Sequence, residues 1–145
     1  MNRIKIELPV NFSFVTEIPI RITDLNYGGH VGNDTVLSLV HEARVRFLQH
    51  FGYSELKIAG VSLIMGDAGI EFKHEMFYGD NIKVHVAAGN FTRVAFDLFY
   101  KLEKPATDKT VTVALVKTGM VCYDYEQKKI VPVPPVLKTN LETTA

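Results

Sequence analysis

The residues best suited to chemistry lie in one stretch, residues 21–52, which opens as a polar, glycine-rich loop and continues as an amphipathic helix. The loop carries Asp24, Asn26 and His30, and Glu42 follows within the expected helix. A carboxylate or an imidazole can take a proton from water, and an amide can hold that water or polarise a carbonyl group. These residue types make the stretch the candidate site of the chain.

Glycines in the loop add backbone N–H groups to this site. Glycine permits positive φ or close approach of the backbone to another group, and Gly28, Gly29 and Gly32 stand in the loop. Asn33 or Asp34 can cap the helix that follows. Because N–H groups at a helix start attract negative charge, the loop and helix start together suit an anion or an oxyanion.

The elements that must position this loop follow from the apolar periodicity. Apolar residues recur at helical spacing from Val36 to Phe51, which predicts one long, largely buried helix that Gly52 ends. Alternation and β-branched runs predict strands over residues 16–22, 70–76, 82–86, 94–102 and 110–123, and residues 3–8 suit a short edge strand. The result is an α+β fold in which an antiparallel sheet of about five strands wraps around the helix.

Composition and charge exclude several classes of function. Lys+Arg and Asp+Glu are equal at 16 each, so no basic field draws nucleic acid or an anionic membrane. No apolar run reaches the length of a membrane span, and the first residues lack the apolar segment of a secretory signal. The single cysteine, Cys122, rules out an intrachain disulfide and a multi-cysteine zinc site and fits a cytoplasmic location.

The histidines and the C-terminal segment carry two further expectations. His74 shares an apolar strand face, so we expect it to be buried or in an interface, and no histidines and carboxylates have metal-ligand spacing. We therefore predict no metal. Prolines 132, 134 and 135 precede polar residues, which predicts that residues 134–145 are extended or disordered and that one domain covers residues 1–133.

Two motifs together carry a resemblance to a known family. The segments Asp24–Asn26 and Gly29–Val31, followed by a helix with His41–Arg44, resemble the acyl-CoA thioesterases of the hotdog fold, the 4-hydroxybenzoyl-CoA thioesterase-like group. The turn Phe77–Asp80 before an alternating strand is similar to a turn of that group, and the resemblance covers about residues 15–133. The periodicity alone agrees with a hotdog fold but does not single it out.

The resemblance implies a function and an assembly. It implies hydrolysis of an acyl-CoA to free acid and CoA, with no cofactor because CoA enters as part of the substrate. It implies a homodimer or homotetramer, with the site between subunits. It places catalysis at Asn26, His30, Asp24 and Glu42, and substrate binding at Gly28, Gly29, Val31 and Gly32.

One residue departs from the family pattern. Many similar thioesterases carry an aspartate where this chain has Asn26, and an amide cannot accept a proton at neutral pH. A carboxylate base must then come from Asp24 or Glu42, or the attacking water must be activated in another way. We favour Glu42 because the family includes enzymes with a helix carboxylate in that role, although its spacing to Arg46 also suits a surface ion pair.

Two other functions stay open at this point. An enoyl-CoA hydratase of the related hotdog type carries Asp-x-Asn-Pro-x-His, whereas residues 24–30 have one extra residue and no proline. A non-catalytic acyl-CoA-binding protein would explain Asn26 directly.

Residues 110–123 form a long run with apolar residues on both faces, so we expect an obligate oligomer.

Overall fold

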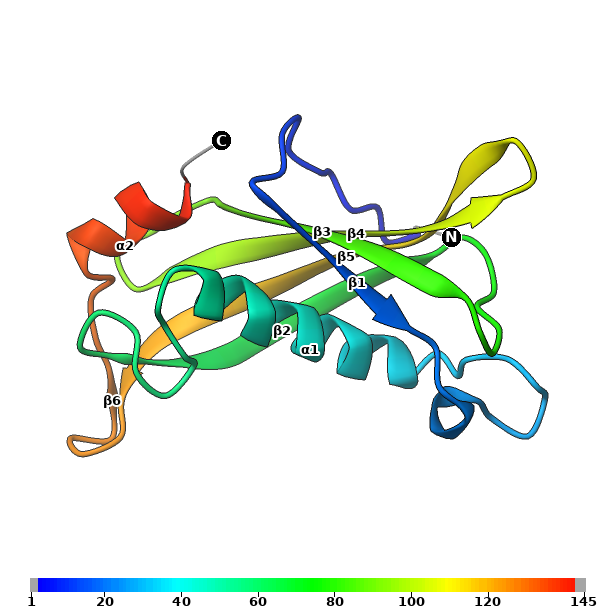
Figure 1. Cartoon of the computed structure of the whole chain (residues 1–145). Coiled ribbons are helices and arrows are strands. Elements are labelled where there is room, and N and C mark those ends of the chain that lie inside the picture. Colours follow the sequence, from blue (N-terminus) through cyan, green and yellow to red (C-terminus); the bar gives the residue numbers. More distant parts are fainter. Residues whose placement is uncertain (1–2, 143–145) are drawn as a thin grey trace.

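A computed structural model describes residues 3–142, in which one antiparallel sheet curves around a long helix (Figure 1). The strands are β1 Phe14–Pro19, β2 Ser62–Phe72, β3 Asn81–Gly89, β4 Ala95–Ala106, β5 Lys109–Asp124 and β6 Lys129–Ile130. The helices are α1 Thr35–His50, α2 Pro135–Leu141 and a 3-10 turn, η1 Ile22–Asp24. The predicted sheet wrapped around one long helix is confirmed.

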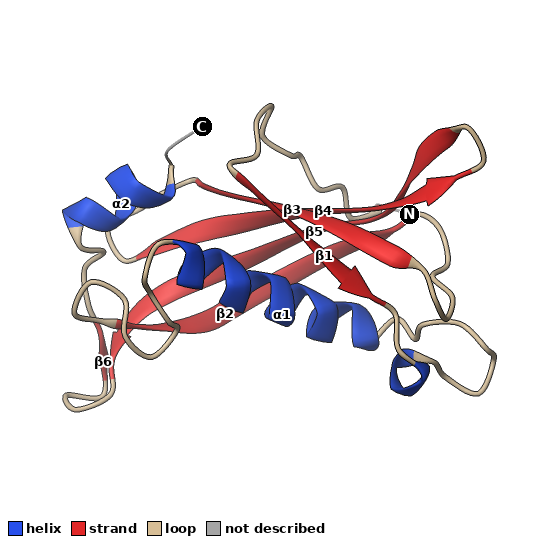
Figure 2. Ribbon diagram, viewed as in Figure 1, coloured by secondary structure: helices blue, strands red, loops and turns tan. Residues whose placement is uncertain are grey.

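The strand order places the first two strands at opposite edges of the sheet. The order is β1-β3-β4-β5-β2, and β6 pairs with β5. Pro19 ends β1 opposite Asn81 of β3, as expected for a proline confined to an edge strand. The chain crosses between these edges through α1, which lies over one face of the sheet (Figure 2).

The buried face of α1 forms the centre of the core. Its apolar side chains recur three and four residues apart and pack against the sheet. They are Val36, Leu39, Val40, Ala43, Phe47 and Leu48. Gly52 takes a positive φ of 81°, and its N–H donates to the Gln49 carbonyl, so the predicted end of the helix is confirmed.

A polar network fastens α1 to the middle of the sheet. The buried guanidinium of Arg44 donates to Glu55 Oε1 at 2.8 Å and to the Tyr100 hydroxyl at 3.3 Å. The Tyr100 hydroxyl also bonds the Thr118 hydroxyl at 2.8 Å. Burial raises the pKa of Tyr100 although the neighbouring guanidinium opposes the shift. Because each polar group has a partner, the network is compatible with the apolar core around it.

Several predicted boundaries were wrong around β2. The strand ends at Phe72 instead of continuing to residue 76. His74 is exposed in the single chain, so only the interface alternative for this residue stays a prediction. The strand also begins earlier, at Ser62, in a segment whose glycines and a bulge after Met65 hide the alternation. Residues 3–8 form no strand, although the Ile6 N–H donates to a Glu71 carboxylate oxygen of β2.

The predicted extended or disordered tail was wrong for residues 135–141, which form α2. Leu137 and Leu141 lie four residues apart, hence on one helix face, and both are fully buried. Pro135 begins the helix, a position where a missing N–H costs nothing. Residues 143–145 lie outside the described residues. Burial of these two leucine side chains thus outweighs the polar composition of this segment.

The buried thiol of Cys122 makes stability depend on alkaline pH. Burial raises its pKa from 9.0 to about 11. Between these values the unfolded chain loses the proton and the native chain keeps it, so stability is complete below pH 9 and falls as pH rises toward 11. We expect the ionisation of this thiol in the unfolded chain to lower the free energy of unfolding by at most about 3 kcal/mol over this pH range.

Urea unfolding of the wild-type chain and Cys122→Ala between pH 8 and 11 measures this contribution. The substitution removes the thiol and should flatten the alkaline loss relative to wild type, while other titrating groups affect both chains alike. Parallel stability curves for the two chains across this range would contradict the expectation.

Candidate active site

The loop between η1 and α1 closes on itself as a tight hairpin. Leu25 and Val31 form an antiparallel bridge, and the Asn26 N–H donates to the His30 carbonyl at 2.9 Å. Gly29 turns the chain with a φ of 84°, a backbone conformation that residues other than glycine rarely adopt. Its N–H donates to the Asn26 carbonyl at 3.1 Å. The hairpin therefore gives His30 a defined position.

Backbone hydrogen bonds dock this hairpin on the connection between β2 and β3. The Val31 N–H donates to the Met76 carbonyl at 2.9 Å. Just before the loop, the Ile20 N–H donates to the Asp80 carbonyl at 2.8 Å, and the Gly79 N–H donates back to Ile20 at 3.2 Å. The hairpin and the connection thus lie together at one end of the sheet, beside the start of α1 (Figure 1).

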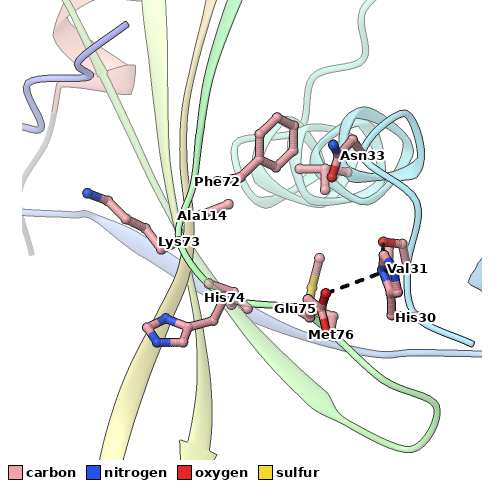
Figure 3. A pocket seen from close by; sticks show the side chains of 11 residues that line it. His30, Val31, Asn33, Phe72, Lys73, His74, Glu75, Met76 and Ala114 are labelled. Atoms are coloured by element: carbon pink, nitrogen blue, oxygen red, sulfur yellow. Dashed lines mark hydrogen bonds and ion pairs between the residues drawn. The ribbon is translucent and has the colours of Figure 1, made fainter. Parts of the chain in front are cut away.

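A pocket of about 300 Å³ lies between these segments. Its apolar lining comes from α1, β5, the end of β2, the connection that follows β2, and the loop. These residues are Val36, Val113, Ala114, Phe72, Met76 and Val31. Its polar residues are His30, Asn33 and Glu75, while Lys73 and His74 turn away from His30 (Figure 3). The pocket therefore combines an apolar floor with a polar rim.

His30 and Glu75 face each other across the rim (Figure 3). The His30 Nδ1 lies 3.1 Å from the Val31 carbonyl oxygen. Because a carbonyl only accepts, Nδ1 carries the hydrogen, and Nε2 of a neutral ring then presents a lone pair. Nε2 lies 3.9 Å from Glu75 Oε1. Alternation placed Glu75 on the wet face of a strand, so the sequence reasoning missed it as a site residue.

The structure places the predicted residues Asn26 and Asp24 in local hydrogen bonds. Asn26 Oδ1 accepts from the Gly28 N–H at 2.8 Å and holds the turn. Asp24 is buried, accepts from the Arg21 N–H at 2.8 Å and pairs with the Arg21 guanidinium at 3.3 Å. Both side chains therefore hold the backbone of η1 and the loop, and neither lines the pocket of His30.

Glu42 lies in a different part of the surface from His30. Its carboxylate accepts from Arg46 at 2.8 Å, and Arg46 also donates to Thr16 Oγ1 of β1 at 2.9 Å. Glu42 and Asp24 line one depression of about 210 Å³ that shares no lining residue with the pocket of His30. Within a single chain, the expected base and His30 are therefore not brought together, and the catalytic role of Glu42 stays a prediction.

The backbone donors of the loop are mostly used within the loop. The N–H groups of Gly28, Gly29 and Val31 all have acceptors, and of the predicted substrate-binding residues only Val31 lines the pocket. Asp34 stands at the N-cap, one of the two predicted positions, but its side chain makes no capping hydrogen bond. Within residues 3–142, the N–H groups of Gly32 and Asn33 donate to no protein acceptor.

Comparison with known proteins identifies the family of the chain. The sequence model of the thioesterase-like superfamily matches residues 20–141. The chain belongs to this superfamily. A 1,4-dihydroxy-2-naphthoyl-CoA hydrolase from Microcystis aeruginosa is 30% identical over 122 residues, which are 82% of this chain and 86% of the relative. The predicted family of thioester hydrolases is confirmed.

Solved structures of the superfamily share the fold. The 1,4-dihydroxy-2-naphthoyl-CoA thioesterase from Synechocystis has a TM-score of 0.77 at 22% identity, over 88% of this chain and 94% of that chain. A mutant of 4-hydroxybenzoyl-CoA thioesterase in complex with 4-hydroxybenzoyl-CoA has a TM-score of 0.79 at 14% identity, over 90% and 98%. The predicted hotdog fold of this superfamily member is confirmed.

Proposed function

We propose that this superfamily member hydrolyses an acyl-CoA thioester to the free acid and CoA. The observation that carries the proposal is the pocket itself. Apolar side chains form its floor, and an imidazole with a free nitrogen lies at its rim beside the start of α1. Hydrolysis needs an apolar seat for the acyl chain, a proton acceptor for water and donors for the oxyanion.

Each requirement has a candidate group at the pocket. Asn33, which lines the pocket, and its neighbour Gly32, which does not, offer free N–H groups before a 16-residue helix, where the helix dipole also favours developing negative charge. The Asn33 side-chain amide lies on the rim, without a hydrogen bond in the described part of the chain, and can bind the same oxygen. Asn26 holds the loop, and the reaction needs no cofactor because CoA arrives with the substrate.

The size and lining of the pocket favour a compact, flat acyl group. Phe72 and Met76 offer an aromatic face and a thioether, which pack well against an aromatic ring. The named relatives act on naphthoyl-CoA or hydroxybenzoyl-CoA thioesters. We therefore propose an aromatic acyl-CoA as the preferred substrate over long-chain acyl-CoA.

A panel of aromatic, short-chain and long-chain acyl-CoA substrates tests this function through release of free CoA thiol. The only protein thiol, Cys122, is buried and should not react with the detecting reagent in the native chain. Release of thiol from an aromatic substrate supports the proposal. Hydration of an enoyl-CoA, or binding of acyl-CoA without thiol release, would favour one of the two alternative functions instead.

We infer a homodimer or homotetramer from the exposed edge of the sheet. β2 pairs with β5 on one side only, and its 11 residues leave a long edge that carries the half-exposed Met65 and Phe72. Such an edge is suited to pairing with a second copy of the chain. Sedimentation at micromolar concentration tests this inference, and a stable monomer would contradict it.

We also infer a cytoplasmic location. Within residues 3–142, no helix is both long and apolar enough to cross a membrane. The free thiol of Cys122 and the balance of 16 basic and 16 acidic residues are consistent with that compartment and with a partner other than nucleic acid. Fractionation of cells that express the chain, with detection in the soluble fraction, tests this inference.

We expect Glu42→Gln to lower kcat less than about tenfold, well below the usual general-base range. The reason is that Arg46 neutralises this carboxylate in a depression separate from His30. Asp24→Asn should mainly lower stability, by about 1 kcal/mol, because Asp24 accepts hydrogen bonds that hold η1. Steady-state thiol release and urea unfolding measure the two effects. A hundredfold loss of kcat in either variant would assign the base to that residue.

A further inference from the structure

Glu75 is the one carboxylate that lines the pocket of His30 among the described residues. We propose that Glu75 and His30 together hold the attacking water and that the imidazole takes its proton. The inference rests on the proposed thioesterase function and supplies the base that Asn26 cannot provide. Glu75 thus becomes a catalytic residue on the connection between β2 and β3, outside the loop and the helix.

The distance between the two groups suits a shared water. A neutral His30 presents a lone pair at Nε2, because Nδ1 donates to the Val31 carbonyl, and an ionised Glu75 presents only acceptors. A water that donates one hydrogen bond of about 2.8 Å to each of two acceptors holds them about 4.4 Å apart. The observed 3.9 Å between Nε2 and Oε1 is close to this value and too long for a direct hydrogen bond.

No lysine or arginine side chain among residues 3–142 pairs with the Glu75 carboxylate, in contrast to the other candidate carboxylates. Asp24 pairs with Arg21 and Glu42 with Arg46, whereas the Glu75 carboxylate has His30 as its only ion-pair partner among residues 3–142. Its side chain is 62% exposed and that of His30 is 32% exposed, so water and substrate can reach both. A carboxylate without a competing cation can stabilise an imidazolium beside it.

Contacts from β4 hold the backbone of Glu75 in place. Lys104 Nζ donates to the Glu75 carbonyl at 2.7 Å and to Asp80 Oδ2 at 3.1 Å, and lies 5.0 Å from the centre of the Phe77 ring. On the other side, the next residue, Met76, accepts the Val31 N–H of the loop. These fixed backbone contacts limit the reorientation needed at the moment of reaction.

The proposed step conserves atoms and charge. One water proton moves to His30 Nε2 while the water oxygen bonds to the thioester carbonyl carbon, and the carbonyl π electrons move to oxygen, where N–H groups at the start of α1 stabilise them. The tetrahedral intermediate then breaks its C–S bond. The departing CoA sulfur takes the proton from Nε2, which leaves a free acid and CoA thiol. Glu75 stays ionised and stabilises the imidazolium between these two transfers.

A double-mutant cycle with thiol release tests the pairing. We expect Glu75→Gln to lower kcat about 100-fold with KM changed less than about threefold, because the amide keeps the shape but loses the charge. Glu75→Asp should recover part of kcat. The kcat of the double variant Glu75→Gln with His30→Ala should be at most about twofold lower than the kcat of His30→Ala alone, since both residues act on one water.

Glu126→Gln is the matched control, because this exposed residue follows β5, outside the pocket, and loses the same charge. It should keep wild-type kcat, and unchanged melting temperatures should show that all variants fold. A Glu75→Gln variant that keeps more than half of wild-type kcat, or losses that multiply in the double variant, would overturn the pairing alone. A wild-type chain that releases no thiol from any acyl-CoA would overturn the thioesterase function as well.

Discussion

His30→Ala is expected to lower kcat for thioester hydrolysis by about 10²- to 10⁴-fold, the usual loss when a general base is removed. The imidazole is the group at the pocket rim best suited to accept a proton near neutral pH, and its Nε2 faces the pocket. Truncation removes this acceptor and leaves the apolar floor intact. Single-turnover thiol release should therefore slow while substrate affinity changes little.

His41→Ala provides the matched control for this loss. His41 is an exposed histidine on α1 that contacts Glu55 at 3.3 Å and lies outside the pocket. It should keep most of the wild-type kcat. Asn26→Ala should lower turnover less than His30→Ala, because Asn26 holds the turn through Gly28 and does not line the pocket. A His30→Ala variant with full activity on the best substrate would remove this residue from the site.

Phe47→Ala is expected to lower the free energy of unfolding by about 3–5 kcal/mol, the range for removing a buried aromatic ring. Phe47 is fully buried on α1, and its ring lies 5.7 Å from that of Phe14 on β1 and 5.1 Å from that of Phe51. The substitution leaves a cavity at the contact that holds the helix against the sheet. Urea unfolding of the variant and wild type at one protein concentration measures the loss.

Val136→Ala is the control for this effect, because Val136 is 51% exposed on α2. This substitution should lower the free energy of unfolding by less than about 0.5 kcal/mol. Folded Phe47→Ala should keep most of its kcat, since Phe47 lies about 20 Å along the helix axis from Asn33 at 1.5 Å per residue. A loss below about 1 kcal/mol would show that the core does not depend on this ring.

The sequence by itself determined the elements whose signals are local. Helical spacing predicted α1, and alternation with turn residues predicted β3, β4 and β5 within a few residues of their observed bounds. Gly29 and Gly52 both take positive φ in the structure, as a loop turn and a helix end require. The loop and helix motifs also indicated the thioesterase family that the comparisons confirm.

Tertiary structure decided the parts where local signals are weak or conflicting. β2 contains Gly66 and Gly69 and a bulge, so its first half shows no alternation, and pairing with β5 defines it as a strand. Composition favoured an extended or disordered end, but burial of Leu137 and Leu141 makes α2 a helix. In both cases long-range contacts supply free energy that no short window of sequence displays.

The grouping of site residues was also decided by tertiary structure. Helix spacing kept both a catalytic role and an ion pair open for Glu42, and the fold shows the pair with Arg46. Glu75 comes close to His30 because the Val31 N–H bonds the Met76 carbonyl, far away in the sequence. Backbone hydrogen bonds between distant segments depend on the folded path and not on side-chain type, so the sequence pattern could predict His30 but not its neighbour.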